Sequence, residues 1–134
     1  MRTIVYVDGY NFYFGVLRGT PYKWLDLVGL VKHICRVQNP NIEITAVKFF
    51  TAPVITKLAT QGEKALHSQD TYHKALKNAH EGVIEIINGY FVMEKGTPPK
   101  YKNPVDKLDR VEVWRLEEKQ TDVNIAMHLY RDAC

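Results

Sequence analysis

Thr3–Gly15, with the sequence TIVYVDGYNFYFG, is the stretch that decides the fold. Its first five residues, Thr3–Val7, predict a buried strand, which ends on Asp8 and turns at once through Gly9. Open α/β sheets place their ligands and metals at the carboxyl ends of the strands. We therefore expect an α/β fold in which Asp8 marks a functional site.

The composition is that of an ordinary globular protein. The 134 residues are 46% hydrophobic and 25% charged, which is too apolar for intrinsic disorder and sufficient for one core. No segment approaches the roughly 20 apolar residues of a membrane helix, and the N-terminus lacks the layout of a signal peptide. We expect a single domain over residues 1–134, in the cytoplasm and without a membrane partner.

Charge and cysteine content add little to this. A formal net charge of +3 is compatible with a nucleic-acid partner but does not require one. Cys35 and Cys134 have neither the number nor the spacing of a disulfide framework or a zinc site. The five histidines also lack zinc-like spacing, so we expect them in the core or on the surface.

Hydrophobic spacing predicts three helices and two further strands, at residues 24–37, 61–80 and 121–133 and at residues 42–50 and 83–87. The order strand, helix, strand, helix, strand predicts right-handed crossovers in a mostly parallel sheet. Residues 88–94 and 111–116 flank a turn-prone segment and predict an antiparallel β-hairpin arm.

The DGYN turn places the carboxylate of Asp8 and the amide of Asn11 three residues apart. Gly9 between them can adopt backbone angles that other residues avoid, so the turn can aim both side chains into one crevice. The alternative is that Asp8 and Asn11 form side-chain turns and cap the element that follows. The spacing alone does not decide between these two roles.

A second acid, Asp122, stands in the first turn of the last predicted helix. An acid there complements the helix dipole. Asp122 also shares the apolar face of Ile125 and Leu129, which predicts that it points toward the sheet edge where Asp8 arrives. Two converging carboxylates suit a hard divalent cation, and such a metal suits the hydrolysis of a phosphodiester.

Five segments together resemble a known family: residues 5–15 (VYVDGYNFYFG), 19–27 (GTPYKWLDL), 49–53 (FFTAP), the spacing Gln69, Tyr72, Ala75, Leu76, and residues 117–126 (EEKQTDVNIA). The family is the NYN domains of the PIN-like nuclease superfamily, in its bacterial LabA-like branch. The resemblance implies a Rossmann-like, PIN-like three-layer α/β/α fold. It also implies a metal-dependent ribonuclease that processes RNA.

The same resemblance assigns roles to three residues. Asp8 and Asp122 would bind Mg²⁺ or Mn²⁺, and Asn11 would orient a ligating water or a phosphate oxygen. Such domains continue beyond the last helix into a strand that supplies another acid, and residues 1–134 do not include it. We therefore expect weak or absent nuclease activity, and uncovered apolar faces that favour a homo-oligomer.

Candidate substrate contacts are Tyr10, Lys23, Gln69, Lys119 and Thr121. Lys23 stands beside Trp24, and a cation next to an aromatic ring suits phosphate contact with base stacking. Gln69 lies on an apolar helix stripe, so its amide needs partners, either backbone near the site or substrate. Lys119 reaches a phosphate or pairs with a neighbouring glutamate. Thr121 also predicts a helix N-cap.

Two other functions stay open. One is a non-catalytic module that binds nucleic acid or protein. The other follows from the same resemblance, because some relatives of this branch are described as small-molecule hydroxylases of pyridine catabolism. The chain has no G-x-G-x-x-G fingerprint, so the sequence does not support a tightly held flavin or nicotinamide.

Overall fold

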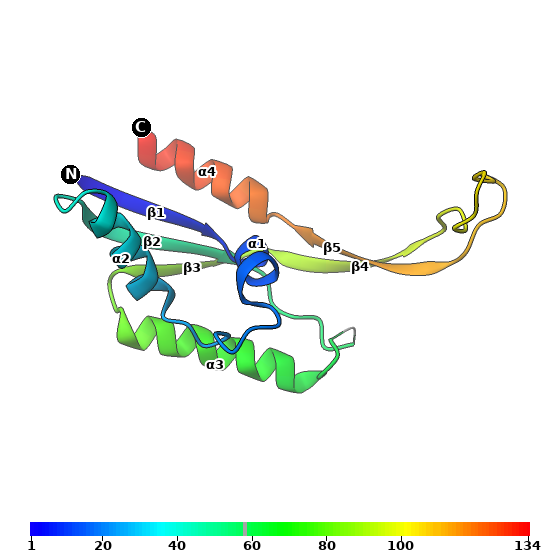
Figure 1. Cartoon of the computed structure of the whole chain (residues 1–134), viewed down its shortest axis with the longest axis horizontal. Helices are drawn as coiled ribbons and strands as arrows, with labels where there is room; N and C mark the ends of the chain where they lie inside the picture. The colour runs from blue at the N-terminus through cyan, green and yellow to red at the C-terminus, as the bar shows by residue number, and fades with distance from the viewer. Residues whose placement is uncertain (58) are drawn as a thin grey trace.

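A computed structural model describes residues 1–57 and 59–134 (Figure 1). The sheet strands are β1 (Arg2–Asp8), β2 (Glu43–Thr51) and β3 (Ile84–Asn88), and the arm strands are β4 (Tyr90–Gly96) and β5 (Val113–Lys119). The helices are α1 (Gly9–Phe12), the π-helix η1 (Tyr13–Leu17), α2 (Leu27–Gln38), α3 (Glu63–Ala79) and α4 (Thr121–Ala133).

The main sheet is parallel, with the strand order β1-β2-β3. Val7 of β1 lies opposite Phe49 of β2, which in turn lies opposite Ile86 of β3. The predicted α/β class, the parallel sheet and the hairpin arm are confirmed. A PIN-like arrangement is not.

The central strand β2 separates two packing layers. Phe49 is buried against Leu27 of α2 and Leu76 of α3. Phe50 points to the other face, where its ring lies 5.4 Å from the ring of His128 on α4. Figure 1 accordingly shows α3 and α4 on opposite sides of the sheet. Side chains alternate between the faces of a strand, so one strand supplies both layers.

The turn after β1 is helical, which the sequence pattern does not predict. Asp8 caps α1, and the backbone continues directly into η1. Gly9 is buried here, and a Cβ atom on it would lie 2.7 Å from the carbonyl oxygen of Phe50. A glycine is therefore needed for α1 to begin against the end of β2.

The β4–β5 arm extends away from the sheet as a twisted antiparallel ribbon (Figure 1). Its pairing runs from Tyr90 opposite Lys119 to Gly96 opposite Val113. On one face of this ribbon, Met93 lies opposite Leu116, between the pairs Phe91–Glu118 and Lys95–Trp114. No helix in the described part of the chain is long and apolar enough to cross a membrane.

Candidate functional site

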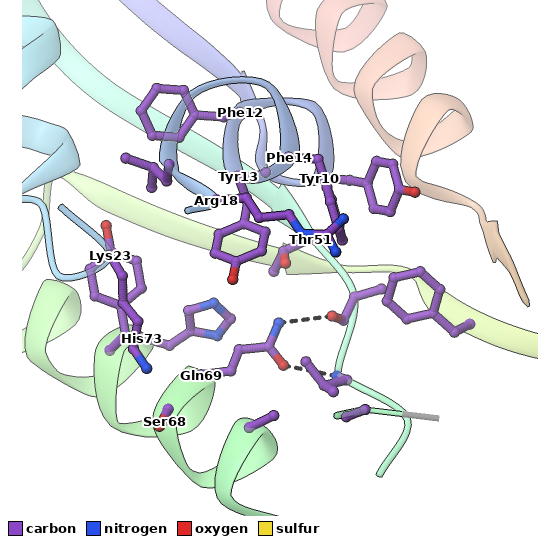
Figure 2. A pocket seen from close by; sticks show the side chains of 18 of the residues that line it. Tyr10, Phe12, Tyr13, Phe14, Arg18, Lys23, Thr51, Ser68, Gln69 and His73 are labelled. Atoms are coloured by element: carbon purple, nitrogen blue, oxygen red, sulfur yellow. Dashed lines mark hydrogen bonds between the residues drawn. The ribbon is translucent and has the colours of Figure 1, made fainter. Parts of the chain in front are cut away.

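A cavity of about 630 Å³ opens where the end of β2 meets α1, η1, α3 and the base of the arm (Figure 2). This volume lies within the range of small-molecule sites. Its lining includes the aromatic side chains of six residues that form two of its walls: Tyr10, Phe14, Trp24, Phe49, Tyr72 and Phe91. The cavity lies beside the first strand end, close to where the sequence predicts a functional site.

One wall of the cavity is a row of rings from the turn after β1 to the arm. The ring centroids of Tyr10 and Phe14 are 4.5 Å apart, and those of Tyr10 and Phe91 are 6.3 Å apart. The guanidinium carbon of Arg18 lies 5.2 Å from the centroid of Phe14. This wall therefore begins with a cation and continues as an aromatic surface.

A second row of rings follows from Trp24 into α3. The Trp24 and Tyr72 rings meet edge to face at 6.1 Å, and His73 meets Phe49 in the same manner at 5.7 Å. The ammonium of Lys23 lies 5.4 Å from the Trp24 ring. The predicted cation beside an aromatic ring is thus present, and this wall also has a cation at one end.

His73 and Gln69 point from α3 toward the cavity, and Tyr13 points toward α3 from η1 (Figure 2). Burial lowers the pKa of His73, and the nearby Lys77 lowers it further, whereas Asp70 opposes the shift. The imidazole is therefore neutral at neutral pH. It presents one hydrogen-bond donor and one acceptor on its ring nitrogens.

Gln69 fixes the segment that follows β2. Its side-chain oxygen accepts a 2.9 Å hydrogen bond from the Val54 backbone N–H, and its amide nitrogen donates one of 2.9 Å to the Ala52 carbonyl. The sequence predicts that the Gln69 amide pairs either with backbone or with substrate, and the structure shows backbone partners. Gln69 therefore shapes the cavity wall by holding the chain beside it.

Glu118 on β5 lies among acids at the arm side of the cavity. Burial raises the pKa of its carboxyl, the nearby Asp8 and Asp122 raise it further, and a hydrogen bond from Thr121 opposes the shift. The two predicted acids thus both lie near Glu118. The sequence analysis did not single out Glu118.

The DGYN turn adopts its capping alternative. The Asp8 carboxylate accepts a 3.0 Å hydrogen bond from the Asn11 backbone N–H and a 2.6 Å hydrogen bond from the Asn11 side chain. Neither residue is among those that line the cavity, and neither is Asp122, which is exposed at the start of α4. Their predicted catalytic roles stay predictions.

Two other candidates are engaged within the protein. Lys119 pairs with Glu117, which is the alternative to phosphate contact. Thr121 is the first residue of α4 and donates its hydroxyl to Glu118. The predicted N-cap at Thr121 is wrong, because Gln120, in the left-handed region at φ 70°, takes that position.

Sequence reasoning predicted Tyr10, Lys23 and Gln69 in this region, and all three line the cavity. It missed Phe14 and Arg18. Their signal was the spacing of the aromatic residues after Asp8, because residues four apart share one face of a helical turn. That spacing was visible only once the turn was known to be helical.

In comparisons with known proteins, the chain is 42% identical, over an alignment of 155 residues, to the 6-hydroxy-3-succinoylpyridine 3-monooxygenase HspA of Pseudomonas putida (strain DSM 28022 / S16). That relative is a monooxygenase. The match covers 99% of this chain and 48% of the relative, so the chain spans about half of the relative's length. No protein-family model and no solved structure matches.

These findings correct the family assignment. The resemblance to NYN domains is supported by no family model, and the curated relative is a monooxygenase. The nuclease interpretation and its Mg²⁺ or Mn²⁺ cofactor are therefore wrong. Among the described residues, no group of three or more histidine, cysteine or acidic side chains is arranged to hold a metal. Binding of RNA and association with a second copy stay predictions.

Proposed function

We propose that this chain forms the substrate-binding part of an oxygenase that hydroxylates a pyridine-type aromatic acid. The observation that carries the proposal is the 42% identity, over 99% of the chain, to a 6-hydroxy-3-succinoylpyridine 3-monooxygenase. It corresponds to the hydroxylase alternative of the sequence analysis.

The cavity supports this function on physical grounds. Two aromatic rows suit a flat heteroaromatic ring, because offset and edge-to-face ring pairs are favourable beyond the area that they bury. The neutral His73 offers polar contacts to hydroxyl or ring-nitrogen groups of such a substrate. Together they make a mostly apolar site with a few polar groups, as is typical of small-molecule pockets.

The proposed reaction consumes one O₂ for each substrate. One oxygen atom forms the new carbon–oxygen bond of the hydroxylated product, and the other leaves as water. This requires two electrons and two protons, and the electrons come from a reduced nicotinamide or flavin donor. The role of this chain is to bind the ring, orient it and exclude water from it.

The described residues do not build a recognisable redox-cofactor site. They contain no metal-binding group of three histidine, cysteine or acidic side chains, and the chain has no G-x-G-x-x-G turn. The cavity residues accordingly fit a substrate rather than a metal ion or a dinucleotide. No proton or electron transfer through a cofactor is assigned to them.

The experiment uses 6-hydroxy-3-succinoylpyridine as the probe. The protein is incubated with it, a reduced nicotinamide, added flavin and heavy-isotope dioxygen, and the products are analysed by mass spectrometry. We expect one labelled oxygen atom in the product. Tyr72→Phe, which retains the ring, is expected to keep turnover, whereas Phe14→Ala and Trp24→Ala weaken substrate binding.

The control variant is Tyr130→Ala, on an exposed position of α4 outside the cavity lining. It is expected to match the wild type. Product without the label, or with the label coming from water, would contradict an oxygenase. Failure of the probe to bind the folded protein would contradict the substrate-binding role of this chain.

A further inference from the structure

We infer that Arg18 binds the carboxylate of the aromatic substrate, while Lys23 adds positive charge from the opposite side of the cavity (Figure 2). Together they make the cavity selective for aromatic acids over their neutral esters and amides. This inference rests on the proposed function, because it names the part of the substrate that the same cavity recognises. The ring would lie against the two aromatic rows, and a flexible acidic arm would reach the Arg18 guanidinium.

Both cations belong to one short loop between η1 and α2. Leu17 anchors the start of the loop, because its side chain is 5% exposed. The Thr20 hydroxyl donates a 2.7 Å hydrogen bond to the Leu17 carbonyl and accepts one of 3.2 Å from the Tyr22 N–H. These hydrogen bonds brace the loop that carries Arg18 and Lys23, both of which line the cavity.

The environment of the two cations favours an anion. Each lies over a ring, Arg18 over Phe14 and Lys23 over Trp24. Within the described part of the chain, neither forms an ion pair with an acidic side chain. Their N–H donors are thus open to a ligand, and Arg18 can hold a carboxylate through two parallel hydrogen bonds.

The distribution of charge within the cavity gives the ligand a direction. Arg18 and Lys23 stand on the loop, whereas Glu118, the one acid among the described lining residues, stands on β5 of the arm. The pKa of His73 is lowered by burial, so this residue adds no charge in between. A negative group is therefore attracted to these two cations and repelled from Glu118.

The experiment compares 6-hydroxy-3-succinoylpyridine with its methyl ester by isothermal titration calorimetry. The two ligands have the same ring and arm and differ only in the carboxylate charge. We expect the wild type to bind the acid about tenfold or more tightly than the ester, the range of a hydrogen bond to a charged group. This preference should fall as salt is raised, because both cations are solvent-accessible.

Two variants test the assignment. Arg18→Gln is expected to weaken acid binding about tenfold and to leave ester binding unchanged. Lys23→Gln removes only a more distant charge and should weaken acid binding less. Arg18→Lys keeps the charge but not the paired donors, so its loss should be smaller. Arg36→Gln, on an exposed position of α2 away from the cavity lining, is the charge-matched control and should bind both ligands as the wild type does.

The outcomes separate this inference from the proposed function. Equal affinity for acid and ester, or an unchanged preference in Arg18→Gln, overturns the carboxylate assignment while oxygenation of the ring stands. Failure of the folded wild type to bind either ligand overturns both. Circular dichroism of each variant verifies that the fold is retained, and a misfolded glutamine variant is replaced by Arg18→Lys at high and low salt.

Discussion

Lys48 and Asp132 join the central strand to the last helix from positions 84 residues apart. The Lys48 ammonium donates to the Asp132 carboxylate, which also accepts a 2.6 Å hydrogen bond from the Tyr6 hydroxyl. The side chain of Lys48 is 6% exposed and that of Asp132 is 16% exposed. This pair therefore attaches α4 to the sheet through a partly buried ion pair.

Asp132→Asn is expected to lower the melting temperature clearly. The substitution leaves the mostly buried Lys48 ammonium with only the exposed Glu85 carboxylate, 4.0 Å away, as an anionic partner, and a poorly compensated buried charge is destabilising. The control is Asp70→Asn, which breaks an exposed pair with Lys74 on α3. Exposed pairs contribute little, so the control should unfold at the wild-type temperature.

The same pair predicts the response to acid. Hydrogen bonds from Lys48 and Tyr6 hold the pKa of Asp132 below its usual range. Because the folded pKa is depressed, its contribution to stability is complete above the unfolded pKa of about 4 and is lost as the pH falls through the folded pKa. Acid unfolding monitored by circular dichroism should be steeper in the wild type than in Asp132→Asn.

Gly9→Ala should destabilise the turn that forms the cavity edge. Its Cβ would lie 2.7 Å from the Phe50 carbonyl and 2.8 Å from the Phe49 ring, so backbone must move. We expect a loss of about 1–3 kcal/mol in the free energy of unfolding, as for other overpacked sites. Gly15→Ala meets nothing within 4 Å and is the matched control. In urea titrations it should be neutral or slightly stabilising.

Gln69→Ala should loosen the segment after β2. It removes both side-chain hydrogen bonds to this segment and leaves the buried Ala52 carbonyl without its partner, at a cost of about 1–3 kcal/mol. Hydrogen exchange at the Val54 amide should accelerate. Gln69→Glu keeps the hydrogen-bond acceptor but loses the donor. Its exchange rate at the Val54 amide should lie between those of the wild type and Gln69→Ala. An unaltered exchange rate in Gln69→Ala would show that the segment after β2 keeps its conformation without the Gln69 side chain.

Asp26→Ala tests the start of α2. The Asp26 carboxylate caps this helix by accepting a 3.0 Å hydrogen bond from the Gly29 N–H, and it lies 2.7 Å from Nε2 of His80. Loss of the cap should cost about 1 kcal/mol in thermal unfolding. Asp26→Asn retains a capping oxygen and should lose less.

The Asp26 pair also depends on pH. Burial raises the pKa of Asp26, but the hydrogen bonds from Gly29 and His80 outweigh it and lower the pKa overall. The stabilisation is therefore present above the unfolded pKa of about 4 and disappears as the pH falls through the folded value. The difference in stability between wild type and Asp26→Asn should shrink in acid. A constant difference would contradict an ionic contribution.

Two tyrosines should titrate late in alkali. Burial raises the pKa of Tyr72 to about 12, and burial together with the hydrogen bond to Asp132 raises that of Tyr6 to about 12. The contribution of the two raised pKa values to folding stability is complete below the unfolded pKa of about 10. It is lost as the pH rises through about 12. Phenolate absorbance should show a late phase that Tyr6→Phe and Tyr72→Phe each reduce.

Most helices and strands could be predicted because the spacing of apolar residues within each segment is a local property of the sequence. The last helix begins and ends at the predicted residues, and β1, β2 and β3 lie within two residues of their predicted bounds. The orientation of α4 could not be predicted from its own sequence. The contacts of His128 and Asp132 with the sheet set its rotation, so Thr121 is buried and Asp122 is exposed.

The cavity was only partly predictable for a related reason. Its aromatic rows combine the turn after β1, the loop before α2, α3 and the arm, and such contacts leave no periodic signal. Phe91 illustrates this, because it lies 81 positions after Tyr10 in the sequence and yet its ring lies 6.3 Å from that of Tyr10. The hairpin arm was predicted, but its contribution to a cavity was not.

The alternation of Lys48 and Phe49 on β2 has a consequence for folding. A shift of one residue in strand pairing would exchange the two faces of β2. It would insert the Lys48 ammonium among Leu27 and Leu76 and turn Phe49 toward α4. Mispaired sheets of this kind are therefore penalised by an unpaired buried charge, and the lysine that attaches the last helix also selects the correct alignment of the strands.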